Sequence, residues 1–343
     1  MSTSLITEIR AGKKQRAHRW AATLLLLAII AAAACIALLI FGTVYYPLPV
    51  VIDVLMGEQV KGANFAIETI RLPKMLGGLF AGFAFGVSGY IFQTILRNPL
   101  ANPNVIGITA GSSAAAVFCI LILHSSEAFV STASIVAGLL TVVILFLLAR
   151  GPAFSIGKIV LIGIAVQAIC NAMITYIMLL GREHDLAAAM RWLTGSLNGI
   201  SMDDLPLLVF STIGITLLLQ LLGNSMLVLE LGEQPATSLG IRTDVVRLSL
   251  IIGSVLLCAI ATAVTGPLAS IALLAGPIAN RMAGTGRSNM LAAGLVGANL
   301  VLIAELIGQF AFTIKYPAGI ITAIIGAPYL IILLIRMNRR GSF

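Results

Sequence analysis

Residues 20–42 read WAATLLLLAIIAAAACIALLIFG, an apolar run without a single charged side chain. A bilayer core about 30 Å thick requires roughly 20 apolar residues in one helix, so this run is long enough to cross a membrane. The run is too long for the apolar region of a signal peptide, and no clear small-residue cleavage site ends it. We therefore predict a first transmembrane helix, whose basic flank (Lys13, Lys14, Arg16 and Arg19) stays in the cytoplasm.

The composition extends this conclusion to the whole chain. Of 343 residues, 59% are hydrophobic and 10% are charged, and the mean hydropathy is +1.06. Soluble domains carry about 25% charged residues, which excludes a compact soluble fold, and disordered chains are poor in apolar residues. Aromatic residues make up only 6% while glycines number 33, which favours closely packed helices over a β-barrel. The sequence predicts an all-α polytopic membrane helix bundle.

Ten apolar segments follow one another along the chain. They are 20–42, 72–96, 103–123, 129–149, 157–180, 204–222, 245–265, 268–282, 290–312 and 317–336. Gly266, Pro267, Gly276 and Pro277 interrupt the eighth segment, which we expect to be a broken or tilted helix. The predicted organisation is a cytoplasmic tail over 1–19, a transmembrane domain over 20–336 and a second cytoplasmic tail over 337–343.

The basic residues orient the bundle. With ten crossings, six of the 21 Lys and Arg side chains fall on the outer side, and the others fall in cytoplasmic segments. The six outer residues are Lys61, Arg71, Lys74, Arg182, Arg191 and Lys315. This bias predicts that both termini are cytoplasmic. Cations that orient the bundle in the membrane also explain the net charge of +8, so we expect no nucleic acid as a partner.

Patterns that support catalysis or metal binding are sparse. The three histidines, His18, His124 and His184, lie far apart in loops, and the four cysteines lie inside apolar runs without the spacing of a metal site. The chain has no phosphate-binding loop of the P-loop type and no Gly-x-Ser-x-Gly nucleophile motif. We expect no bound cofactor, no metal and no catalysis by this chain itself, and a membrane enzyme is a remote alternative.

An intramembrane carboxylate, repeated glycines and a candidate outer helix also stand out in the sequence. Glu305 is an intramembrane carboxylate without an obvious partner in sequence, so a structural role and a substrate role stay equally open. Glycines repeat at four-residue spacing, at 78, 82 and 86 and again at 107 and 111, which predicts close helix packing. The outer segment 187–198 is a candidate short helix around Trp192, either covering a channel mouth or anchoring the chain at the interface.

Two cytoplasmic loops are more than connectors. Residues 97–104 (RNPLANPN) combine two prolines with three asparagines, which predicts a rigid polar turn. The longest loop, 223–244, contains LGEQPATSLG at 231–240, where Pro235 suits a first helical turn and Gly240 suits a helix end. We predict a short helix on the membrane face there, either contacted by a soluble partner or lying at the interface without one.

At these motifs the sequence resembles the permease subunits of bacterial ABC importers for iron–siderophore complexes, haem and vitamin B12. The resemblance extends from about residue 20 and rests on the order of several motifs. These are RLPK at 71–74, GVSG at 86–89 with Gln93, RNPLA at 97–101, WLTGSL at 192–197, the 231–240 loop, Gly266-Pro267, PAGIITA at 317–323 and GAP at 326–328. The residues at 195–199 and 229–232 are most similar to those of ferric enterobactin permease subunits.

The resemblance implies a type II ABC importer permease fold and a set of partners. It implies a second permease subunit, a paralogue rather than an identical copy, and two cytoplasmic ATPase subunits that carry the ATP and Mg²⁺. A periplasmic or lipid-anchored binding protein would deliver ferric siderophore, of the catecholate type, to the bacterial cytoplasmic membrane. Haem or cobalamin is the alternative cargo, and an ion-coupled secondary transporter is the alternative of another class.

The resemblance also implies roles for particular residues. Arg71 and Lys74 match positions that dock the binding protein, and Lys315 stands in for a third basic position that is Gln309 here. The ATPase-coupling positions are Gly232, Glu233, Ala236, Leu239, Gly240 and Arg281. The gate and pathway positions are Asn98, Leu100, Ser155, Ile156, Gly157 and Trp192. A histidine usual in the family is replaced by Ile278, which leaves coupling around 276–281 in doubt.

Overall fold

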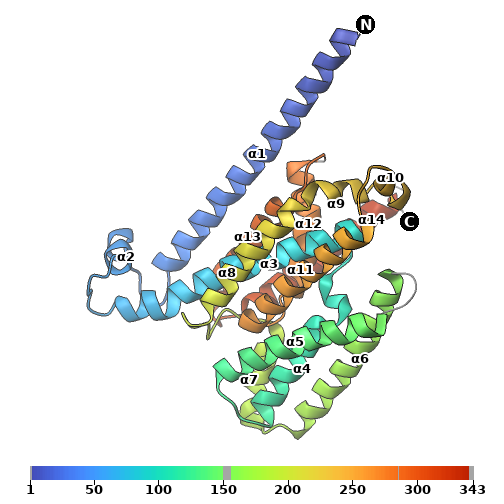
Figure 1. Ribbon diagram of the computed structural model, residues 1–343. Helices are drawn as coiled ribbons and strands as arrows, with labels where there is room; N and C mark the ends of the chain where they lie inside the picture. The colour runs from blue at the N-terminus through green and yellow to red at the C-terminus, as the bar shows by residue number, and fades with distance from the viewer. Residues whose placement is uncertain (1, 150–155, 285, 340–343) are drawn as a thin grey trace.

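The computed structural model describes residues 2–149, 156–284 and 286–339, and their regular structure is helical (Figure 1). The first half contains α1 (Ser2–Ile40), α2 (Leu48–Leu55), α3 (Leu72–Ile95), α4 (Ile108–Leu121), α5 (Glu127–Ala149), α6 (Ile156–Leu180) and α7 (Glu183–Thr194). The second half contains α8 (Leu205–Leu221), α9 (Gly223–Leu229), α10 (Glu233–Ser238), α11 (Thr243–Thr265), α12 (Ala269–Ala283), α13 (Met290–Phe310) and α14 (Ala318–Arg339).

Each of the ten predicted segments coincides with a helix. Seven helices among the described residues are long and apolar enough to cross a membrane, and α8 and α9, bent by 56° relative to each other, are so only when taken as a pair. The remaining two, α4 and α12, have 14 and 15 residues, about 21–23 Å at 1.5 Å per residue, which is shorter than the hydrocarbon layer. Neighbouring helices surround both of them, so the non-helical backbone at their ends is sheltered from lipid.

The helix that contains the predicted first span, 20–42, extends well beyond it on the N-terminal side. Helix α1 begins at Ser2 and projects beyond the bundle at its N-terminal end (Figure 1). Residues 2–19 contain no proline and are rich in Ala, Lys, Arg, Gln and Glu, which lose little side-chain entropy in a helix. The predicted boundary at residue 20 marks a change of environment and does not mark the start of the helix.

Helix α3 is the centre of the bundle and packs against α11, α12 and α13. Its glycines allow this, as predicted for positions 78, 82 and 86. A Cβ on Gly82 would lie 2.6 Å from the Gly297 carbonyl oxygen of α13, and one on Gly86 would lie 2.2 Å from that of Ala293. Gly89 meets α12 in the same way, 1.9 Å from the Ala272 oxygen. Any side chain at these positions would force the backbones apart.

Helix α4 is the centre of a second group with α5, α6 and α7 (green in Figure 1). A short 3-10 turn, Pro103–Ile106, leads into it through Gly107, whose φ of +81° favours glycine. Gly111 faces α5, where an added Cβ would lie 2.0 Å from Thr141 Oγ1. The predicted packing role of both glycines is confirmed.

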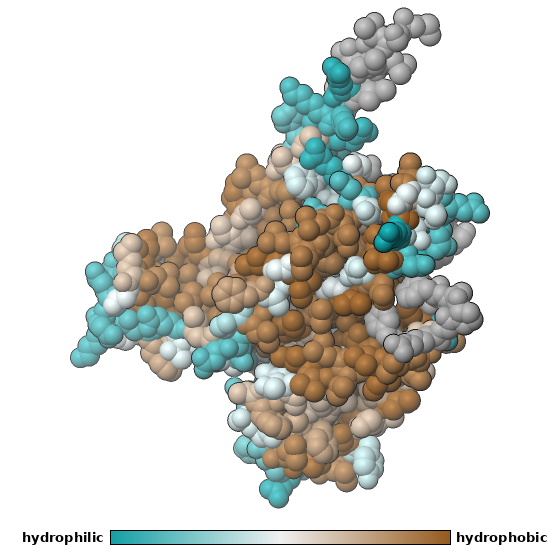
Figure 2. Space-filling model, in the orientation of Figure 1, coloured by the Kyte–Doolittle hydropathy of each residue, from teal (hydrophilic) through white to brown (hydrophobic). Residues whose placement is uncertain are grey.

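Hydrophobic side chains cover the outside of the bundle. Figure 2 shows hydrophobic surface over its middle and hydrophilic surface on the projecting part of α1, around α10 and at the opposite margin. Exposed side chains include Leu161, Phe210 and Leu218, at 69%, 75% and 66%. A soluble monomer does not expose so much contiguous apolar surface, so this band faces lipid or a partner subunit.

Three elements were not anticipated. Helix α2, the π-helical turn Phe65–Arg71 before α3 and the short α9 lie outside the predicted spans. The outer helix predicted within 187–198 is present as α7 but begins earlier, at Glu183, because Glu183 and Asp185 suit its positive N-terminal end.

Candidate functional site

Three sequence motifs meet at the outer end of the bundle. The backbone N–H of Ser196 donates to the Thr265 oxygen at 2.8 Å, and that of Gly319 donates to the Gly195 oxygen at 3.2 Å. Gly195 and Gly266 have φ of +75° and +70°, and a Cβ on Gly266 would lie 2.4 Å from the Trp192 oxygen. The glycines of the 192–197, 266–267 and 317–319 motifs therefore hold the segment after α7 against α14.

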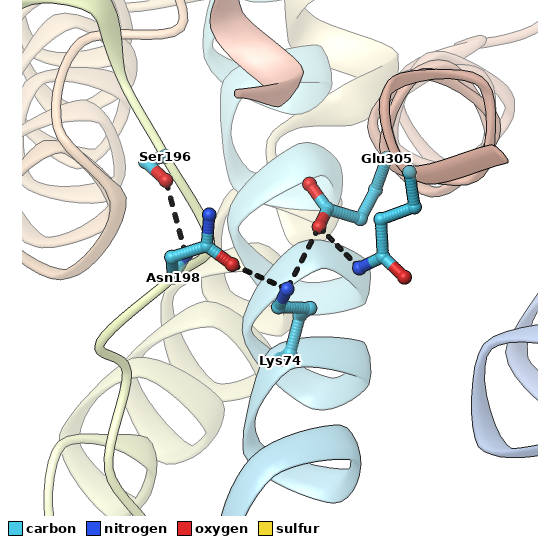
Figure 3. A network of polar contacts seen from close by, with 5 residues as sticks. Lys74, Ser196, Asn198 and Glu305 are labelled. Atoms are coloured by element: carbon cyan, nitrogen blue, oxygen red, sulfur yellow. Dashed lines mark hydrogen bonds and ion pairs between the residues drawn. The ribbon is translucent and has the colours of Figure 1, made fainter. Parts of the chain in front are cut away.

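A buried polar network lies beside this segment (Figure 3). The Lys74 ammonium on α3 lies 3.0 Å from Glu305 Oε1 on α13 and also donates to the Asn198 side-chain oxygen. Gln309 Nε2 donates to the same Glu305 oxygen at 2.7 Å. The side chains of Lys74 and Glu305 are only 13% and 2% exposed. Glu305 thus has a partner, which sequence analysis missed because the two residues are far apart in the chain.

Arg71 also forms buried interactions. Its guanidinium donates to the backbone oxygens of Leu39 and Ile40, at 2.7 and 2.8 Å, and to that of Val44. The guanidinium carbon lies 4.9 Å from the centre of the Tyr46 ring. Arg71 therefore satisfies carbonyls at the C-terminal end of α1, where a helix leaves several without an internal partner.

Lys315 is the exposed cation of the three predicted docking residues. It lies in the loop before α14 and lines an open cavity of about 380 Å³, together with Arg71, Lys74 and Glu305. The structure thus brings the three predicted docking cations to one outer cavity, although two of them already have partners within the chain.

A second outer cavity, of about 370 Å³, lies between the α4–α5 loop and α7. Trp192, His124 and Asp185 contribute to its wall. His124 has a φ of +48° and pairs with Asp185 across a distance of 3.2 Å. Trp192 therefore lines a cavity at this end of the bundle.

At the inner end, the 97–104 loop is a hydrogen-bonded turn, as its prolines and asparagines predicted. The Asn98 side chain accepts from the backbone N–H of Leu100 at 2.9 Å, and the Asn98 N–H donates to the Gln93 oxygen. The Arg97 guanidinium donates to the Leu229 oxygen at 2.8 Å. The loop is thereby fixed both to α3 and to α9.

Next to this loop, Gln93 satisfies a carbonyl that proline leaves free. Pro277 has no N–H, so the Leu273 oxygen four residues earlier has no partner within α12. Gln93 Nε2 donates to that oxygen at 3.1 Å and to the Ala272 oxygen at 3.2 Å. Consequently α12 runs through Gly276 and Pro277 as one helix, so of the two expected forms, broken or tilted, the broken form is wrong.

A cavity of about 340 Å³ opens at the same inner end. Gln93, Asn98 and Pro277 line it, with Glu230 at its edge. Partial desolvation raises the pKa of the Glu230 carboxyl although the residue as a whole is exposed, and the positive charge of Arg97 opposes this shift. The predicted gate residue Asn98 and residues of α12 therefore line the same cavity.

The predicted short helix in the longest loop is present as α10. Gly232 and Gly240, with φ of +125° and +80°, flank it on either side. Ala236 is fully buried, whereas Leu231 and Leu239 are each 66% exposed. Glu233 Oε1 lies 3.1 Å from the Arg247 guanidinium of α11, which ties α10 to a membrane-spanning helix.

The remaining predicted residues lie around the same inner face. Arg281 is exposed at the end of α12, and its backbone oxygen accepts from Arg19 at 2.7 Å. Gly157 is exposed in the first turn of α6, which begins at Ile156. Ser155 lies outside the described residues.

Known proteins match this architecture over almost its whole length. The FecCD transport family model matches residues 24–336. The ferric enterobactin transport system permease protein FepG of Escherichia coli (strain K12) is 34% identical over 83% of this chain and 87% of its own. The Fe(3+)-citrate import system permease protein YfmE of Bacillus subtilis (strain 168) is 35% identical over 91% and 94%. An inward-facing structure described as a metal-chelate type ABC transporter covers 91% of this chain and 98% of its own, with a TM-score of 0.81 and 25% identity.

A bundle of this kind, without an ATPase motif of its own, is the membrane-spanning permease of an ABC importer. The chain belongs to the FecCD transport family.

Proposed function

We propose that this chain is one of two permease subunits of an importer that carries ferric siderophore, of the catecholate type, across the bacterial cytoplasmic membrane. Both of its termini then lie in the cytoplasm, and the cytoplasmic tails are residues 1–19 and 337–343. Two ATPase subunits supply ATP and Mg²⁺, and this chain binds no cofactor. Two ferric enterobactin transport system permease proteins of Escherichia coli, FepG and FepD, are relatives of this chain, at 34% and 32% identity. This supports a paralogue as the second permease.

The observation that carries the coupling proposal is α10. Leu231 and Leu239, on either side of α10, expose large apolar side chains that a soluble partner can cover. Figure 2 shows hydrophilic surface around α10. The buried Ala236 and the Glu233–Arg247 pair anchor the helix to α11, so a force on α10 reaches a spanning helix. Gly232, Gly240 and Arg281 complete the proposed ATPase-facing surface.

A double substitution tests this surface. Replacing Leu231 and Leu239 by serine is expected to uncouple ATP hydrolysis from transport while the subunit still inserts and assembles with its partner permease. The matched control replaces two exposed leucines of the hydrophobic band, Leu217 and Leu218, by serine as well. Unchanged transport in the first variant would contradict the coupling role of α10.

For the outer face, we propose that the cavity with Lys315, Lys74 and Arg71 receives acidic groups of the binding protein. Lys315 is exposed and makes direct contact, whereas Lys74 and Arg71 contribute positive charge from the wall of the cavity. Charge complementarity of this kind mainly steers docking and sets its orientation. Lys315→Glu is expected to slow association with the binding protein more at low salt than at high salt.

The pathway gate is proposed to lie between Trp192 at the outer mouth and Asn98, Leu100, Ser155, Ile156 and Gly157 at the inner face. Cargo is tested with proteoliposomes that contain the complete importer, offered ferric catecholate, ferric citrate, haem and cobalamin in turn. Uptake of the ferric catecholate above the others supports the proposal. Preferential uptake of haem or cobalamin would assign the alternative cargo.

A further inference from the structure

Three arginines converge where α1 enters the membrane. Arg16 lies beside Gly286, where an added Cβ would be 3.7 Å from the Arg16 Cδ, and Arg19 lies beside Gly284 at 3.6 Å from its Cζ. The Arg287 guanidinium carbon lies 5.5 Å from the centre of the Trp20 ring. One side of the α12–α13 loop and one turn of α1 thus bring three guanidinium groups into the same small region.

This cationic cluster has no acidic partner among the side chains that the structure describes. The sequence contains no Asp or Glu between Glu8 and Asp53, and none between Asp244 and Glu305. Among the side chains that the structure describes, none of the ion pairs involves Arg16, Arg19 or Arg287. Like charges held together repel one another, so the arrangement favours a bound anion.

One of the three arginines is fixed by the fold. Arg19 Nε donates to the Met282 oxygen at 2.9 Å, and its terminal nitrogen donates to the Arg281 oxygen at 2.7 Å. These bonds cap the C-terminal end of α12 and hold the guanidinium in place. Arg16 and Arg287 are both exposed. A guanidinium group so arranged can bind phosphate oxygens through paired N–H groups.

The position of the cluster selects the kind of anion. Trp20 begins the apolar run, and tryptophan side chains settle at the membrane–water interface. Immediately beyond it, α1 exposes apolar side chains, including Leu25 at 63% and Ile29 at 57%. A phosphate at the cluster would therefore be level with the lipid headgroups, with acyl chains able to lie along α1.

We propose that Arg16, Arg19 and Arg287, with Trp20, form a binding site for the headgroup phosphate of an anionic phospholipid in the cytoplasmic leaflet. The bound lipid bridges α1 to the inner end of α12. Basic pockets between transmembrane helices on the cytoplasmic side are suited to such headgroups. An acidic surface of an ATPase subunit is the competing occupant, and the experiment separates the two.

Trp20 supplies the reporter, because the chain has only two tryptophans. In a full-length Trp192→Phe chain in nanodiscs, brominated phosphatidylglycerol is expected to quench the Trp20 fluorescence more than brominated phosphatidylcholine does. Arg16→Gln with Arg287→Gln should lower this preference by roughly 25-fold, at about fivefold for each cation near an anionic surface. The matched control, Arg10→Gln with Lys14→Gln, removes two charges from the same helix away from the loop and should retain most of the preference.

Several results would overturn the proposal. Equal quenching by the two lipids would show no preference for the anionic headgroup. An equal loss in the control variant would mean that the basic N-terminal segment attracts anionic lipid without a specific site. Loss of quenching on addition of excess inorganic phosphate would assign the site to a free anion. Native mass spectrometry of the assembled importer should show more retained phosphatidylglycerol for the wild type than for the Arg16→Gln/Arg287→Gln variant. Equal retention would mean that a partner subunit covers the cluster, and the lipid assignment would fail.

Discussion

Removing Lys74 is expected to destabilise the subunit more than removing its partner. In Lys74→Met, the Glu305 carboxylate stays 2% exposed, with only Gln309 as a donor and with Oε2 already lacking a partner in the described structure. Breaking a buried ion pair in this way costs about 3–5 kcal/mol. In Glu305→Leu, the Lys74 ammonium still donates a hydrogen bond to the Asn198 side-chain oxygen, and the Lys74 side chain is 13% exposed. The expected loss of stability is therefore smaller, about 1–3 kcal/mol.

The double variant Lys74→Met/Glu305→Leu removes both charges and leaves apolar side chains of similar length. Its cost should be well below the sum of the single costs, because replacing a buried pair by apolar groups is often close to neutral. Unfolding by denaturant in detergent micelles measures the stability of the wild type, the two single variants and the double variant. Additive effects, or a Lys74→Met variant as stable as the wild type, would refute a buried pair. The double variant should also insert normally and yet dock the binding protein less well.

Three further substitutions test the packing. Gln93→Leu leaves the Leu273 carbonyl without a donor and should lower stability by about 1–3 kcal/mol, measured by denaturant unfolding; a neutral result would mean that Pro277 needs no such partner. Gly86→Val forces α3 from α13 and should cost at least about 1–3 kcal/mol, whereas Gly12→Ala, with open space around it, should be neutral or stabilising in the same assay. Arg71→Met should lower the thermal unfolding temperature by freeing carbonyls at the end of α1, and rescue by Arg71→Lys to wild-type stability would contradict the several bonds assigned to it.

The sequence predicts the elements that depend on local pattern. Apolar length predicts ten segments that each coincide with a helix, Pro235 and Gly240 predict α10, and glycine spacing predicts the packing face of α3. What it misses depends on residues far apart in the chain. Nothing near Glu305 indicates Lys74, and nothing near Pro277 indicates that Gln93 replaces its missing hydrogen bond. The helical start of α1 was missed because apolar length marks the membrane and not the helix.

The candidate site follows the same division. Sequence motifs identified the segments at 192–197, 266–267 and 317–319, but only the structure shows that they meet through Gly195, Gly266 and Gly319. Sequence reasoning identified Arg71 and Lys74 only as cations at positions that match a docking site for the binding protein. Burial of the two side chains, with carbonyls and a carboxylate as partners, could not be read from their spacing.

The most direct test of the account is transport by the complete importer reconstituted in proteoliposomes, with its binding protein loaded with a ferric catecholate. The account predicts accumulation that requires ATP on the side of α10, persists when ion gradients are collapsed by ionophores, and is lost in Leu231→Ser/Leu239→Ser. Accumulation that continues without ATP, or that follows an ion gradient, would contradict it.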